Sequence, residues 1–169
     1  MIKLRASTGV IALLALVAAC SGDNSENKGE RETLENKGSA PIAASAATSG
    51  PPLATDLATL DGTVFSSFTG DAAAGKLVFA QCRACHVTDA GVNKAGPSLN
   101  GIVGRKSGSV PGFTYSTANA NIGVIWTKEK LFQYLEKPQR VIPKTKMIFA
   151  GLPDAQKRAN LIAYLANPT

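Results

Sequence analysis

The chain has 169 residues and a formal net charge of +6, with 44% hydrophobic and only 6% aromatic residues. This length allows one domain with appended segments rather than several large domains. There are only three cysteines, two of them in one short motif, which excludes a disulfide framework that would stabilise a small core.

Residues 1–19 are predicted to be an export signal. Lys3 and Arg5 precede an apolar stretch that is too short to span a bilayer, since a spanning helix needs about 20 apolar residues. The stretch ends in Leu-Val-Ala-Ala-Cys20, which resembles the lipobox of bacterial lipoproteins. We therefore expect Cys20 to carry lipid on the periplasmic side of a bacterial membrane. An ordinary signal peptide ending at Ala19 and an uncleaved membrane anchor are the alternatives.

Residues 20–69, which begin with the cysteine expected to be lipidated, are predicted to be a flexible linker. Residues 39–52 are nearly all Ala, Ser, Thr, Gly and Pro and show neither a helical nor a strand period. Such a composition buries too little apolar surface to offset the entropy of ordering the chain.

The positive charge belongs to residues 70–169, which carry thirteen basic and five acidic side chains, whereas residues 21–69 carry three basic and seven acidic ones. A basic domain favours an acidic partner. The sequence shows no nucleic-acid-binding motif, so we expect no nucleic acid partner.

Residues 70–169 are predicted to form a helical domain. Helices are expected at 72–82, 117–121, 128–137, 139–142 and 154–166. Asp71 and Asp154 suit the N-caps of the first and last helices, and Pro138 should separate the third helix from the fourth.

The motif Cys82-Arg-Ala-Cys85-His86 is typical of covalent haem attachment, in which each thiol adds to a haem vinyl group and the histidine binds iron. A structural zinc site needs four ligands, and the chain has no other histidine. A redox dithiol usually follows a strand, whereas a helix is expected here. The motif therefore predicts one covalent haem c per chain.

The second axial ligand is predicted by elimination. His86 is the only histidine, methionine is the usual partner, and Met1 would leave with the signal. Met147 remains, although a lone methionine is often only core filler. A His/Met pair raises the reduction potential and leaves iron no open position, which favours electron transfer over catalysis.

Residues 70–168 resemble the class I, mitochondrial-type cytochromes c. Beyond the cysteine motif, the resemblance rests on Gly96-Pro97-Ser98-Leu99, Gly104-Arg105-Lys106-Ser107-Gly108, Pro111-Gly112-Phe113-Thr114-Tyr115-Ser116, Trp126, Pro143-Lys144-Thr145-Lys146-Met147-Ile148-Phe149-Ala150-Gly151 and Leu161-Ile162-Ala163-Tyr164-Leu165. It implies an all-α fold of four or five helices around one covalently bound haem c.

The resemblance implies that Pro97 accepts a hydrogen bond from His86, which fixes the tautomer that binds iron. Arg105 would neutralise a haem propionate, and Tyr115 and Trp126 would donate hydrogen bonds to the propionates.

On the other side of the haem, the resemblance implies that Tyr134 and Asn119 tune Met147 and that Phe149 covers the exposed haem edge. Without the family resemblance, a purely structural role is as well supported for three of these residues: Tyr115, Trp126 and Tyr134 could simply be core aromatics.

The chain departs from this pattern at two positions near the proposed methionine ligand. Lys144 stands where mitochondrial members usually carry glycine, and Gln139 where they usually carry a docking lysine.

These observations predict a membrane-tethered, monomeric carrier of single electrons rather than an enzyme. It would accept electrons from a quinol–cytochrome c reductase and deliver them to a terminal oxidase or a photosynthetic reaction centre. The alternatives are a haem peroxidase with a weakly held Met147 and a ligand-sensing haem module.

Overall fold

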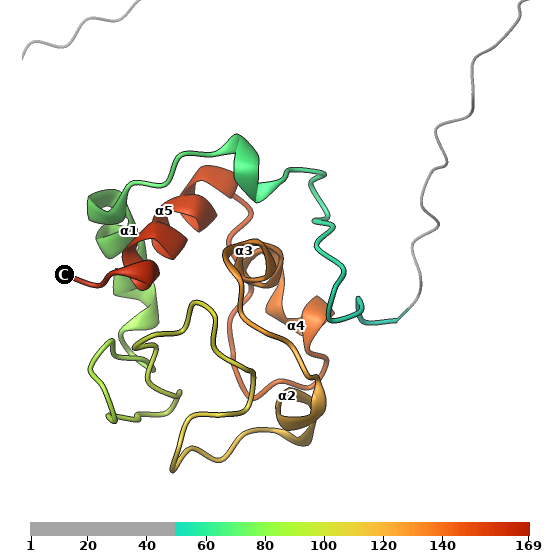
Figure 1. The fold of residues 1–169 in the computed structure, drawn as a ribbon, viewed down its shortest axis with the longest axis vertical. Helices are drawn as coiled ribbons and strands as arrows, with labels where there is room; N and C mark the ends of the chain where they lie inside the picture. The colour runs from blue at the N-terminus through green and yellow to red at the C-terminus, as the bar shows by residue number, and fades with distance from the viewer. Residues whose placement is uncertain (1–49) are drawn as a thin grey trace, which may run out of the picture. The chain divides into compact units, whose positions relative to one another are not determined.

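The computed structural model describes residues 50–169 (Figure 1). The expected export signal, Cys20 and the linker as far as residue 49 lie outside the described residues. Within residues 50–169 the regular structure is helical, apart from one isolated antiparallel bridge between Lys106 and Ile125. The helices, in chain order, are η1 (Phe65–Ser67), α1 (Ala72–Phe79), η2 (Ala80–Cys82), α2 (Thr117–Asn121), α3 (Lys128–Glu136), α4 (Pro138–Val141) and α5 (Ala155–Ala166). The all-α prediction is confirmed.

The helices begin and end close to the predicted residues. The expected helix 72–82 consists of α1 followed by the 3-10 turn η2. Pro138 starts α4 rather than preceding it, because proline has no N–H and its fixed φ suits the first helical position. Asp154 caps α5 by accepting a hydrogen bond from the Lys157 backbone N–H at 3.0 Å.

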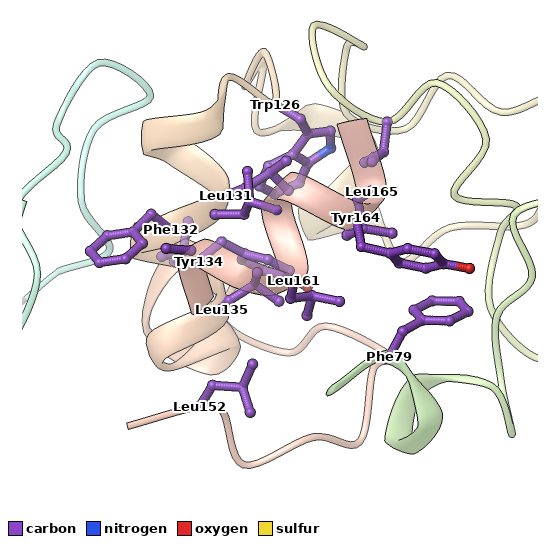
Figure 2. Packing of buried hydrophobic residues seen from close by; sticks show 14 of the residues in the cluster. Phe79, Trp126, Leu131, Phe132, Tyr134, Leu135, Leu152, Leu161, Tyr164 and Leu165 are labelled. Atoms are coloured by element: carbon purple, nitrogen blue, oxygen red, sulfur yellow. The ribbon is translucent and has the colours of Figure 1, made fainter. Parts of the chain in front are cut away.

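The first and last helices of the domain, α1 and α5, cross in direct contact (Figure 1). Gly75 permits the crossing, since a Cβ at this position would collide with the backbone carbonyl of Asn160. Beside it the rings of Phe79 and Tyr164 pack with their centroids 5.3 Å apart (Figure 2). Aromatic pairs at this spacing add stability beyond the area they bury.

Helix α3 is central to the core, and every side chain from Lys130 to Glu136 is buried. Leu131 and Leu135 belong to the same apolar cluster as Leu161 and Leu165 of α5 (Figure 2). A helix that carries charged residues and is still buried on all sides needs polar partners around it.

The partners of α3 come from residues 53–68, which we call the N-terminal strap (Figure 1, teal to green). The rings of Phe65 and Phe68 pack on Phe132 of α3, with centroids 5.7 and 5.6 Å away. The Lys130 ammonium donates hydrogen bonds to the carbonyls of Leu53 at 2.9 Å and Asp56 at 2.8 Å.

The strap corrects the predicted flexible linker, which extended to residue 69. Its two phenylalanines bury apolar surface on α3, and its backbone pairs with buried polar side chains, so residues 53–68 are part of the folded domain. Separately, no helix within residues 50–169 is both long and apolar enough to cross a lipid bilayer.

Candidate functional site

A cavity of about 300 Å³ lies inside the helical domain. Its wall is mainly apolar and is built from segments far apart in the chain. Every residue that the sequence analysis assigned to the cofactor lines this cavity, namely Cys82, Cys85, His86, Pro97, Arg105, Tyr115, Asn119, Trp126, Tyr134, Met147 and Phe149. Cys20, the expected lipidation site, lies outside the described residues.

The two cysteines and the histidine share one tight turn at the end of η2. The backbone N–H groups of Cys85 and His86 both donate to the Cys82 carbonyl, at 3.1 and 2.9 Å. Burial, helped by nearby Cys85, raises the pKa of the Cys82 thiol to about 11. A reactive dithiol needs a lowered pKa and usually follows a strand, whereas this one follows a helix.

A zinc site also fits this part of the chain poorly. Among residues 50–169, no group of three or more His, Cys, Asp and Glu side chains is arranged to hold a metal ion. The motif is thus better suited to the covalent attachment of haem than to a zinc site or a redox dithiol.

The imidazole of His86 is held in one orientation. Its Nδ1 lies 2.7 Å from the Pro97 carbonyl oxygen, and since a carbonyl only accepts, Nδ1 carries the proton and Nε2 keeps its lone pair. Burial, the main cause, lowers the pKa of His86, which favours the neutral ring. A neutral imidazole with a free Nε2 is a ready iron ligand.

Gly96 is a site residue that the sequence analysis left without a role. A Cβ at this position would collide with the His86 ring, so only glycine lets the chain pass this close. Its place directly before Pro97 was the available signal.

Met147 is placed by α3. The Tyr134 hydroxyl donates a hydrogen bond to the Met147 Sδ at 3.3 Å, and the Met147 backbone N–H donates to the Thr145 hydroxyl at 3.2 Å. Burial raises the pKa of Tyr134 to about 12, so the hydroxyl keeps its proton at neutral pH. A thioether lining this cavity is a soft ligand suited to haem iron.

The polar side chains of the cavity include a half-buried cation. The Arg105 guanidinium donates to the carbonyls of Asn100 and Ser98 at 2.8 and 2.9 Å. The ring of Trp126 packs on Tyr134 with a centroid distance of 4.7 Å.

One buried polar atom in the wall has no partner within residues 50–169, namely the side-chain oxygen of Asn119. Buried polar groups are rarely left unpaired, so this oxygen indicates that the cavity accommodates another molecule.

Comparison with known proteins identifies the family. The sequence profile of the family named Cytochrome c matches residues 72–168, which is more than half of the chain. The chain belongs to the cytochrome c family. Cytochromes c bind covalently attached haem c, which contains iron, and they are electron-transfer proteins rather than enzymes.

Individual relatives cover the same part of this cytochrome c. "Cytochrome c type-1" of Ascaris suum is 60% identical over 97 residues, covering 57% of this chain and 87% of the relative. "Cytochrome c2" of Rhodopila globiformis is 53% identical over 97 residues, covering 57% and 92%. The solved structure of cytochrome cH from Methylobacterium extorquens has 43% sequence identity and a TM-score of 0.55, covering 57% of this chain and 97% of its own. The N-terminal strap of this cytochrome c lies before the profile match.

The cavity of this cytochrome c fits haem c. Two thiols, an imidazole and a thioether line one largely apolar space, together with a cation. These are the groups needed to attach, ligate and enclose an apolar ring that carries carboxylates.

Proposed function

We propose that this cytochrome c carries single electrons on a haem c attached through Cys82 and Cys85, with its iron bound by His86 and Met147. The observation that carries the proposal is that His86 and Met147 line one cavity and that each is oriented by its own hydrogen bond. His86 donates to the Pro97 carbonyl, and the Met147 sulfur accepts from the Tyr134 hydroxyl. When bound, haem iron supplies a one-electron ferric/ferrous couple.

The remaining residues of the cavity would enclose and neutralise the bound group. Arg105, Tyr115 and Trp126 would hold the propionates, because a buried carboxylate is costly without a cation or hydrogen-bond donors. Asn119 would act on the Met147 side, and half-buried Phe149 would cover the haem edge.

The proposed partners are a quinol–cytochrome c reductase as donor and a terminal oxidase or reaction centre as acceptor. The net positive charge of residues 70–169 supports docking on acidic surfaces, and Lys146 brings part of it to the cavity wall. Charge complementarity of this kind speeds encounter more than it tightens binding, which suits a shuttle.

The proposed location is the periplasmic side of a bacterial membrane, with the monomeric chain held by a lipid on Cys20. Lipid labelling in the native host tests the anchor. Cys20→Ala should lose the label, and Ser21→Ala should keep it; a label retained by Cys20→Ala would contradict the lipid anchor.

An optical spectrum of the oxidised and reduced protein tests the ligation. The oxidised protein should show the iron–methionine charge-transfer band, and Met147→Ala should abolish the band and lower the midpoint potential. Ile148→Ala is the matched control, since that side chain is fully exposed. An unchanged spectrum and midpoint in Met147→Ala would contradict Met147 as the ligand.

Two further assays on the same purified protein distinguish this function from a peroxidase and from a ligand sensor. Strong peroxide turnover by the native protein would favour a peroxidase, and rapid carbon monoxide binding to the ferrous form would favour a sensor. A closed His/Met site predicts neither.

A further inference from the structure

Buried polar side chains of α3 bind the backbone of the N-terminal strap. The Glu136 carboxylate accepts hydrogen bonds from the backbone N–H groups of Leu60 at 2.6 Å and Asp61 at 3.0 Å. The Gln133 amide donates to the Ala58 carbonyl at 2.9 Å. Together with the Lys130 contacts to residues 53 and 56, these bonds attach the strap along α3.

The same helix positions Met147, because Tyr134 lies between Gln133 and Leu135 and donates to the Met147 sulfur. On the strap side, Phe132 lies at the opposite end of the core from the Phe79 and Tyr164 pair (Figure 2). Helix α3 therefore joins the strap to the Met147 side of the cavity.

A second connection passes through Arg158 of α5, whose side chain is 0% exposed. Its Nη2 pairs with the Asp61 carboxylate of the strap at 2.6 Å, and its Nη1 donates to the carbonyls of Leu152 and Pro153 at 2.9 and 3.0 Å. Leu152 and Pro153 follow directly on the segment that carries Met147. One buried guanidinium thus holds the strap and the end of this segment together.

A third connection uses α4. Arg140 donates to the Ala58 carbonyl of the strap at 2.9 Å, and its neighbour Gln139 donates to the Met147 carbonyl at 3.5 Å. All three connections run from the strap, which lies outside the family match, to the segment or the helix that places Met147.

We propose that the N-terminal strap is a positioning element for Met147, which keeps the thioether in the cavity by holding α3 and residues 147–153 in place. This inference rests on the proposed function, in which Met147 binds haem iron. The physical reason is the burial of Lys130 and Arg158. Without the strap Lys130 keeps only its hydrogen bond to the Gln133 side chain, and Arg158 loses its ion pair with Asp61. A buried cation that loses partners has to move toward water. Such a movement displaces the elements to which Met147 is attached.

An imidazole titration of the oxidised, full-length haem protein measures how often Met147 is released. Imidazole is an external ligand that competes with Met147 for the iron. Its apparent Kd is inversely proportional to the fraction of molecules in which the methionine is released, so a larger released fraction gives tighter imidazole binding. We expect Asp61→Ala and Phe68→Ala to bind imidazole about three- to tenfold more tightly than the wild type, because the released fraction rises by that factor. Loss of the iron–methionine charge-transfer band reports the binding.

Two variants separate positioning from general stability. Leu53→Ala changes a strap side chain that is 75% exposed and keeps the carbonyl that binds Lys130, so its imidazole Kd should equal the wild-type value. Phe79→Leu weakens the α1–α5 crossing, so it should lower the denaturant midpoint without changing the imidazole Kd. If Asp61→Ala yields no haem protein, Asp61→Asn, which keeps the size but removes the charge, carries the same expectation.

The outcomes are distinguishable. Strap variants with a lowered denaturant midpoint and a wild-type imidazole Kd would overturn the positioning role while leaving the proposed function intact. A charge-transfer band that survives Met147→Ala would instead overturn the proposed function.

Discussion

The Tyr134 hydroxyl donates a hydrogen bond to the sulfur of Met147 at 3.3 Å, which joins a buried helix to the segment that supplies the proposed iron ligand. The donor is a side chain that burial keeps protonated, since burial raises the pKa of Tyr134 to about 12. A hydrogen bond to a thioether withdraws electron density from sulfur and weakens its donation to ferric iron.

Tyr134→Phe should therefore lower the midpoint potential, because a sulfur that donates more strongly stabilises the ferric state. We expect a decrease of about 20–50 mV, which corresponds to about half to one hydrogen bond at 59 mV per tenfold change. Potentiometric titration measures it. Tyr164→Phe is the control, and an unchanged or higher potential in Tyr134→Phe would show that this hydrogen bond does not tune the site.

Lys144 has a φ of 60°, and it is the only non-glycine residue with a positive φ among residues 50–169. This left-handed conformation strains any residue that carries a Cβ. Lys144→Gly should raise the free energy of unfolding by about 1 kcal/mol, measured by denaturant titration. Lys144→Ala removes the same charge but keeps the Cβ, so equal stabilisation by both variants would show that charge, and not backbone strain, is responsible.

Gly96→Ala should prevent correct seating of His86, because the new methyl group would occupy the position of the imidazole. We expect a loss of about 1–3 kcal/mol from overpacking and a fall in haem content per chain, measured from the absorbance of the purified protein. Gly50→Ala is the control, since a Cβ there meets only open space and the backbone is not left-handed. Full haem content with an unchanged spectrum in Gly96→Ala would contradict the close packing.

Asp61 should make the stability of the fold depend on pH under acid conditions. Burial alone would raise its pKa, but hydrogen bonds from Thr63 and Arg158 outweigh burial and hold the pKa of Asp61 well below its ordinary value of 3.8. A carboxyl whose folded pKa is lowered stabilises the fold above the unfolded pKa and loses that effect as the pH falls through the folded pKa. Wild-type stability should therefore decline below about pH 4.

Asp61→Asn should be about 1–3 kcal/mol less stable at pH 7 and should show a flatter stability curve below pH 4, as the lost bond is charge-assisted. Urea unfolding at a series of pH values measures both effects. Glu129→Gln removes an exposed carboxylate as the control. Parallel curves for wild type and Asp61→Asn would rule out this contribution.

The basic charge of residues 70–169 predicts that electron transfer to an acidic partner slows as salt increases. We expect the second-order rate to fall about tenfold or more from low to physiological ionic strength, measured by stopped-flow mixing. Lys146→Gln at the cavity wall should weaken this dependence more than Lys157→Gln, which is on α5 and 60% exposed. A rate that does not respond to salt would contradict charge-steered docking.

Local sequence signals were enough to predict the α-helices and the cofactor, but not the 3-10 helix η1. Asp154 was identified as a cap because a short carboxylate satisfies free N–H groups at a helix start, whatever the rest of the fold. Cys82, Cys85 and His86 form one turn, so their joint chemistry is local as well. Met147 followed from the absence of another histidine in the sequence.

Tertiary structure decided which distant groups meet. The sequence predicted a flexible linker over residues 20–69, because residues 39–52 show neither a helical nor a strand period. Phe65 and Phe68 of this range acquire a role only because their rings pack on Phe132 of α3. The sequence assigned no role to Arg158, yet its side chain is fully buried and paired with a carboxylate 97 positions earlier. Pairings across such separations depend on the packing of whole helices. The short-range spacing of residue types that predicts a cap or a haem motif carries no information about them.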